Sequence, residues 1–263
     1  AARHGHFEVV ERLLAQSPNV NQSEEDGTTP LLAALEELPE PVLNALRTSR
    51  ASCGLGSEAL QMFIKWDGHE AIVRSLLARA ANVNQGDADG HTPLLFAAVM
   101  GNARLVSELL HRQADVNSAD KDWSITPLMC AAGKGFAHIV ELLLAWRARV
   151  DQASRGGRTA LHAAINGDNM ATIEVLISGR ADVNQVTDKG TTPLTRASWR
   201  GSASVARLLI ASRANVNQAN MSGGSPLHHV NCQDCEPLVE VLLASRADIN
   251  HVDEDGDTAL SCA

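Results

Sequence analysis

The chain of 263 residues contains no tyrosine, and aromatic residues make up only 3% of it. Its 44% of hydrophobic residues are therefore mostly Ala, Leu, Val and Ile, whose small and medium side chains suit short, closely spaced helices. Basic residues are also few: the chain has 22 Lys and Arg but 31 Asp and Glu, which gives a formal net charge of -9. Because nucleic-acid binding depends on an excess of basic residues over a surface, we expect no nucleic-acid partner.

Long apolar runs are missing as well. None approaches the roughly 18 residues needed to cross a bilayer, and the first residues, 1–6, lack the apolar core of a signal peptide. The five cysteines are odd in number and irregularly spaced, unlike the framework of a disulfide-stapled secreted domain. We therefore expect no membrane insertion and a location in the reducing cytoplasm or the nucleus.

What the sequence does contain is a motif that recurs at a fixed spacing. From residue 126 onward the motif repeats every 33 residues, and the one step before it, from residue 92, is 34 residues long because the turn at 120–125 carries an extra residue. A constant period of this length predicts a repeat array instead of a single globular core. Thr-Pro-Leu or a close variant begins at Thr29, Thr92, Thr126, Thr159, Thr192, Ser225 and Thr258.

Every unit has the same internal order. Thr followed by Pro is typical of a helix start, because the hydroxyl accepts bonds from early backbone N–H groups and Pro needs no donor in the first turn. A glycine such as Gly135 then permits a reversal, and a second helix follows with one apolar face, as at Ile139, Val140 and Leu143. The unit closes with Arg-Ala-Asp-Val-Asn, as at 180–184, and a polar Asp- and Gly-containing turn that predicts a projecting hairpin.

Two short helices and a hairpin every 33 residues, with Thr-Pro-Leu-His-like starts, resemble the ankyrin repeat. A tetratricopeptide array has a similar period but lacks the Thr-Pro-Leu start and the Val-Asn before a glycine turn. The resemblance covers essentially the whole chain. It implies a single domain, 1–263, that is an all-α repeat solenoid of ankyrin-type helix-turn-helix units with projecting β-hairpin loops.

The stretch between Thr29 and Thr92 fits either one repeat with an insertion or two repeats with three residues missing. Val42 and Leu43 fall on the apolar face of a second helix counted from Thr29, and Ile72 does so counted back from Thr92, so we interpret the stretch as two repeats. Neither end carries the polar face of a capping unit, so we expect a fragment of a longer array. The predicted units are a partial repeat at 1–22, repeats at 29–54, 92–117, 126–151, 159–184, 192–217 and 225–250, a degenerate repeat at 58–84, and a partial repeat at 258–263.

One group of residues suggests metal chemistry. Cys232 and Cys235, with His228 and His229 nearby, could complete a zinc site. However, no second Cys-x-x-Cys accompanies them, and the resemblance gives the position of His228 a structural role, as it does for His162. The remaining histidines and acids form no nucleophile or acid–base constellation, and no phosphate-binding glycine loop follows a strand. We expect no metal, no cofactor and no enzymatic activity.

The resemblance places partner binding on the residues that the scaffold does not dictate, namely the hairpin tips and the ends of the first helices, which line the concave face of ankyrin arrays. Tryptophans at such positions are typical binding hot spots. Around Trp199, basic residues also gather on the same helix and on the hairpins of Arg155, Arg158 and Lys189, forming a basic central groove with acidic flanks. The predicted partner-binding residues are Trp66, Trp123, Lys134, Arg196, Trp199 and Arg200.

We interpret the chain as a non-enzymatic, monomeric interaction module that binds a protein or peptide, an acidic segment with an apolar anchor near Trp199. Three alternatives stay open at this point. The array could be the regulatory or substrate-recruiting arm of a larger enzyme or channel. The ligand could be a small phosphorylated molecule stacked on Trp199 and held by Arg196 and Arg200. The basic residues could also be a solvated face clustered by chance.

Overall fold

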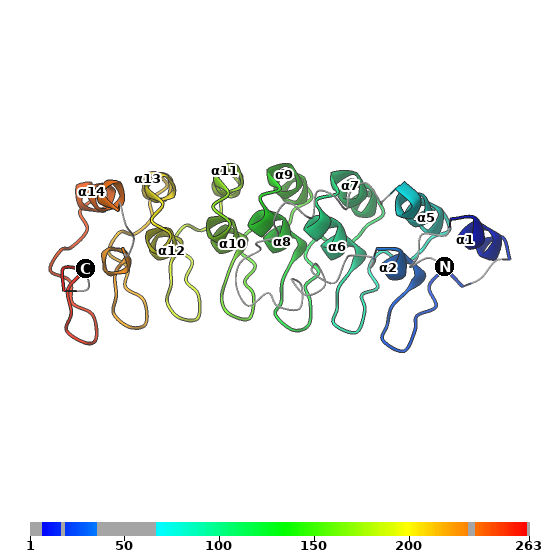
Figure 1. The fold of residues 1–263 in the computed structure, drawn as a ribbon, viewed down its shortest axis with the longest axis horizontal. Coiled ribbons are helices and arrows are strands. Elements are labelled where there is room, and N and C mark those ends of the chain that lie inside the picture. Colours follow the sequence, from blue (N-terminus) through cyan, green and yellow to red (C-terminus); the bar gives the residue numbers. More distant parts are fainter. Residues whose placement is uncertain (1–6, 17–18, 36–66, 231–234, 262–263) are drawn as a thin grey trace.

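The computed structural model describes residues 7–16, 19–35, 67–230 and 235–261 as a row of helical layers (Figure 1). The first helices are α2 (Pro30–Leu35), α6 (Pro93–Met100), α8 (Pro127–Lys134), α10 (Ala160–Asn166), α12 (Pro193–Trp199) and the 3-10 helix η2 (Pro226–His229). The second helices are α1 (Phe7–Leu14), α5 (Asp67–Ala78), α7 (Ala103–His111), α9 (Ala137–Ala145), α11 (Met170–Ser178), α13 (Ala203–Ala211) and α14 (Glu236–Ala244). Within these ranges there is no sheet, so the predicted all-α repeat solenoid is confirmed.

The first helices begin as the sequence predicts. The hydroxyl oxygens of Thr92, Thr126 and Thr192 each accept a hydrogen bond from the backbone N–H three residues later, at 3.0 to 3.4 Å. Thr159 and Ser225 form capping boxes, in which a histidine three residues later accepts from the backbone N–H of the cap. Each cap satisfies donors that have no partner within the helix and so stabilises a helix of only two turns.

Small side chains let the first helices stack closely. Ala131, Ala132, Ala164 and Ala197 are all fully buried where neighbouring first helices meet. The second helices bury the apolar face predicted for them, with Ile139 at 0% exposure. The shortage of aromatic residues is therefore a requirement of thin layers, because a large ring at the alanine positions would force adjacent repeats apart.

The hairpins project from the side of the first helices (Figure 1) and are tied to one another by backbone hydrogen bonds. Arg155 donates its N–H to the carbonyl oxygen of Trp123 at 2.9 Å, and Met221 donates to Lys189 at 3.1 Å. The same kind of bond joins every pair of adjacent hairpins from residue 26 to residue 254. This ladder fixes the positions of the hairpin tips relative to one another.

The hairpin of the 34-residue step is one residue longer, as predicted. The extra residue is Asp122, because the Lys121 N–H and the Trp123 carbonyl make the same ladder bonds as the Ala88 N–H and the Asp89 carbonyl of the preceding hairpin. In the other hairpins a glycine with positive φ occupies the last tip position, for example Gly90 with φ 84°. In the longer hairpin Ser124, with φ 56°, takes that place. The turn closes through the bond from Asp120 N–H to the Ile125 carbonyl, so the insertion is absorbed locally.

In the described part of the stretch from 29 to 84, α2 and α5 form one layer. The two-repeat interpretation also depends on residues 36–66, which the structure does not describe, and it stays a prediction. Ala88 donates its N–H to the Asp26 carbonyl at 2.7 Å, so these two hairpins are direct neighbours. The bond from Asn82 N–H to Asn21 Oδ1 spans 61 residues, whereas its equivalent from Asp115 to Asn84 spans 31.

Helices α2 and α5 pack together as the first and second helix of that layer, as α6 and α7 do in the next. Residues 36–66, which include the predicted starts of the degenerate repeat, lie outside the described residues. Within the described ranges the array has six helix pairs and the second helix α1. The count of seven full repeats stays a prediction.

Candidate functional site

Trp199, the last residue of α12, takes part in an exposed aromatic contact on the side of the first helices. Trp199 is 40% exposed although it follows the buried Ala197 and Ser198. The guanidinium carbon of Arg196, one turn earlier, lies 4.9 Å from the centre of the Trp199 ring, a cation–π distance. The indole therefore presents an accessible surface with a positive charge already placed against it.

His229 completes the aromatic contact from the next layer. Its ring meets Trp199 edge to face with centroids 5.0 Å apart, and Asn220 Nδ2 lies 2.8 Å from its Nε2. Burial lowers the pKa of His229 and the charge of His228 lowers it further, while the charge of Asp253 opposes both. The net shift is downward, so the imidazole is neutral near pH 7. Sequence reasoning missed His229, although it stands at the same repeat position as Arg196, and that shared position was the available signal.

Positive charge is concentrated at Arg196. Burial lowers the pKa of its half-buried guanidinium, and the like charges of Arg158 and Arg200 lower it further. Arg200 is one turn along the same helix, and Arg158 lies directly before the cap of α10, which packs against α12. Over the described part of the chain no salt bridge joins any of these three arginines to a carboxylate, and the buried Nε of Arg196 has no hydrogen-bond partner there.

A buried histidine lies beneath the arginines. His162 is fully buried; its Nδ1 accepts the Thr159 N–H at 3.3 Å, so its Nε2 donates to the Thr191 carbonyl at 3.2 Å. Burial lowers the pKa of His162 to about 4, helped by the charges of Arg196 and Arg158 and opposed by the bond to Thr191. The two arginines belong to neighbouring repeats whose first helices, α10 and α12, pack together. We call Arg158, Arg196, Trp199, Arg200 and His229 the Trp199 cluster.

The other predicted partner-binding residues lie elsewhere. Trp123 is 46% exposed at its hairpin tip. Lys134 ends α8, which is separated from α12 by α10, and its amine nitrogen is buried without a hydrogen-bond partner among the described residues. Trp66 lies outside the described residues. The structure thus brings three of the six predicted residues together, and all six stay predictions as binding residues.

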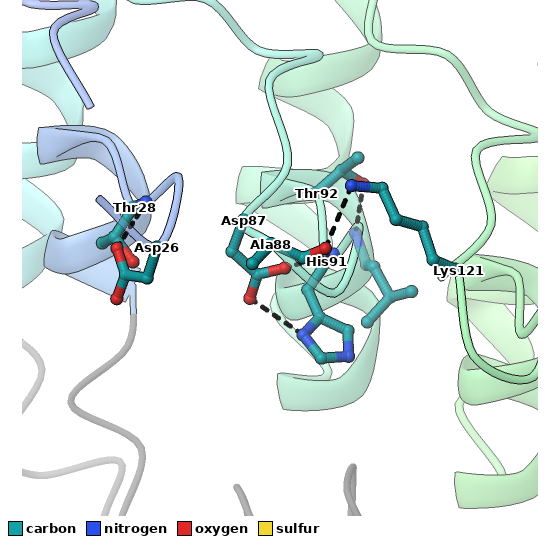
Figure 2. Close-up of polar contacts among 8 residues, drawn as sticks. Asp26, Thr28, Asp87, Ala88, His91, Thr92 and Lys121 are labelled. Carbon is teal, nitrogen blue, oxygen red and sulfur yellow. Dashed lines mark hydrogen bonds and ion pairs between the residues drawn. The ribbon is translucent and has the colours of Figure 1, made fainter. Parts of the chain in front are cut away.

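A second group of ionisable residues occupies the hairpin at 86–91 (Figure 2). One ligand atom from each of Asp87, Asp89 and His91 lies within 4.8 Å of the others, a spacing that would suit a metal ion. The Asp87 carboxylate, however, is bound to His91 Nδ1 at 2.9 Å and to the His91 backbone N–H at 2.8 Å. Lys121 reaches from the next hairpin to the Ala88 carbonyl at 3.0 Å.

These hydrogen bonds account for the arrangement of Asp87 and His91 as part of the hairpin structure. The side-chain oxygens of Asn220 and Asp253 close their own turns in the same way as Asp87 does, at 3.0 and 2.9 Å. Although burial favours the neutral carboxyl group, bonds from His91 and its charge lower the pKa of Asp87. Burial likewise disfavours charged His91, but the bond to Asp87 and nearby carboxylates raise the pKa of His91. The residues form a charge-assisted turn.

The cysteine group offers less to a zinc ion than its sequence suggested. Cys235 is buried at the start of α14 and is disulfide-bonded, which differs from the reduced state that we expected. A disulfide sulfur is not a thiolate ligand. His228 holds the cap of η2 through Ser225 and bonds the Asp257 carbonyl at 3.2 Å. Cys232 lies outside the described residues.

Comparisons with known proteins agree with the fold. A family model of ankyrin repeats in three copies matches residues 40–120, 109–186 and 128–220, and a model of the single ankyrin repeat matches 222–254. A search of curated proteins finds no match. Within the described ranges no helix is long and apolar enough to cross a membrane. Ankyrin repeats generally serve as protein-interaction modules and are typically not catalytic. With most of its length matched, this chain belongs to the ankyrin repeat family.

Proposed function

We propose that the chain is a non-enzymatic interaction module that binds a protein or peptide on the concave face formed by its first helices and hairpins, with the Trp199 cluster as the centre of the site. One observation carries the proposal: an exposed indole lies against Arg196, on which the like charges of Arg158 and Arg200 act, and none of the three arginines has an acidic partner in the described part of the chain. Trp and Arg are the residues most often found at interface hot spots. The scaffold itself does not require either residue at these positions.

The chemistry of the cluster favours an acidic segment with an apolar anchor. A carboxylate or other anion would offset the like-charge repulsion among Arg158, Arg196 and Arg200. An apolar side chain of the same partner would cover the exposed part of Trp199, removing apolar area from water. A monomeric state, a cytoplasmic or nuclear location and the exclusion of nucleic acid remain part of this proposal.

A pull-down with a matched control tests the site. The double variant Trp199→Ala/Arg200→Glu should lose recovery of the dominant partner from a cell extract. The control Trp146→Ala/Arg147→Glu changes an equally exposed tryptophan and the adjacent arginine at the end of α9, in the row of second helices. The control should recover the partner as the parent chain does. Undiminished recovery by the Trp199 variant would reject this site.

A further inference from the structure

The three arginines of the Trp199 cluster present more positive charge than one carboxylate can neutralise. Each guanidinium carries a full charge near neutral pH, and no salt bridge to them exists over the described ranges. Arg196 also carries a buried N–H, at Nε, without an acceptor among the described residues. A half-buried cation among like charges is costly unless an anion accompanies it. The site is therefore suited to an anion with more than one charge.

A phosphate monoester has the matching properties. It carries about 1.5 to 2 negative charges at pH 7 and three acceptor oxygens. Guanidinium groups bind such oxygens in a planar, bidentate manner that lysine cannot reproduce. Arg196 and Arg200 stand one helical turn apart at the end of α12, and Arg158 directly precedes the cap of α10, which packs against α12, so the three guanidinium groups come from two neighbouring repeats.

The surroundings favour a phosphorylated residue within a polypeptide over a long polyanion. The hairpin at 253–257 has four acidic residues and the one at 24–28 has three, and the chain has a net charge of -9. A nucleic acid extending beyond the arginines would meet these like charges. Beside the arginines, Trp199 and His229 offer an aromatic surface for an apolar side chain adjacent to the phosphate.

We infer that Arg158, Arg196 and Arg200 bind the phosphate of a phosphoserine or phosphothreonine residue in a partner protein, while Trp199 contacts an apolar residue next to it. This inference rests on the proposed function and adds the chemical class of the group recognised. It makes phosphorylation of the partner the switch for binding, because an unmodified hydroxyl brings no charge to the cluster.

The test uses fluorescein-labelled degenerate peptide libraries with a fixed central phosphoserine, serine or glutamate, measured by fluorescence anisotropy on the whole chain. The phosphoserine library should bind at least about tenfold more tightly than the other two. Arg196→Gln and, separately, the exposed Arg200→Gln should each weaken that binding at least about tenfold. Arg207→Gln, on the second helix of the same repeat, removes the same charge and should leave binding unchanged. Using both cluster variants keeps the test valid should one of them misfold.

Several results would overturn the inference. Equal binding of the glutamate and phosphoserine libraries would reject phosphate recognition while leaving the proposed acidic partner intact. Full binding by both cluster variants would reject the arginines as the phosphate site. Competition by inorganic phosphate or ATP as strong as that of the phosphopeptides would assign the site to small phosphorylated molecules. Equally tight, Arg196-dependent binding of a single-stranded oligonucleotide would assign it to nucleic acid. The proposed function fails separately, through the pull-down.

Discussion

Two junctions between a hairpin and a first helix handle charge in opposite ways. At the hairpin of residues 86–91, His91 is bound to Asp87, and Lys121 is bound to a backbone carbonyl (Figure 2). At the Trp199 cluster, Arg196 has only like-charged neighbours acting on its pKa. The first arrangement is explained by stability of the turn alone. The unpaired arginines of the Trp199 cluster instead lower the stability of the fold. What distinguishes the candidate site from the scaffold is therefore the lack of internal partners for its charges, more than the number of charges.

The largest effect expected from this comparison concerns His162, the neutral imidazole beneath the arginines. The pKa of His162 in the folded chain is about 4, below the unfolded value of 6.5. The stabilisation of the fold by the neutral imidazole is therefore complete above pH 6.5 and is lost as the pH falls toward 4. The parent chain should therefore lose up to about 3 kcal/mol more stability than His162→Gln over that range. Urea unfolding at a series of pH values measures the difference, in which titrations common to both proteins cancel. Parallel pH profiles would contradict a neutral buried His162.

A smaller effect of partly opposite sign is expected at the compensated junction. The pKa of His91 is raised, so the stabilisation of the fold by charged His91 is complete below pH 6.5 and is lost as the pH rises through the raised pKa. The pKa of Asp87 is lowered, so the stabilisation by its carboxylate is complete above pH 3.8 and is lost on acidification. Asp87→Asn should cost about 1 kcal/mol near pH 5.5 and less at pH 8.5. Asp253→Asn is the matched control, because Asp253 closes its turn without a histidine partner. Equal urea midpoints for the two variants at pH 5.5 would show that the interaction of Asp87 with His91 adds no stability beyond closing the turn.

The smallest effect on stability is expected at the uncompensated junction itself. Arg200→Gln removes a like charge from the exposed edge of the cluster, so the free energy of unfolding should stay within about 0.5 kcal/mol of the parent value or rise slightly. Thermal unfolding of Arg200→Gln and Arg207→Gln in low salt measures this. A clear loss of stability in Arg200→Gln alone would mean that the Arg200 guanidinium donates a stabilising hydrogen bond within the fold. The Trp199 cluster would then not differ from the hairpin at 86–91 in lacking partners for its charges.

The regular part of the array could be predicted from the sequence because each repeat uses local chemistry. Thr caps, the buried alanines and the glycine turns depend on neighbours a few residues away or one period away. The pairing of α2 with α5 could not be predicted, since the apolar residues of both helices fit the phase of a repeat start and a repeat end whatever lies between them. Long-range contacts, such as Asn82 to Asn21, show which of the described elements are neighbours.

The candidate site was predictable in part. Arg196, Trp199 and Arg200 share one short helix, so their proximity follows from helical geometry. The edge contact of His229 and the approach of Arg158 depend on how layers stack, which the periodic pattern does not specify at the level of side chains. The disulfide at Cys235 was missed for a similar reason, since spacing alone does not determine which cysteines are oxidised.

Hydrogen exchange of the chain with and without its captured partner tests the central claim most directly. Amides of the hairpins and first helices around the Trp199 cluster, at 154–158, 191–200 and 220–229, should become protected, while those of the second helices α9, α11 and α13 should not change. Protection confined to the second helices, with none around Trp199, would contradict binding on the face to which the proposal assigns it.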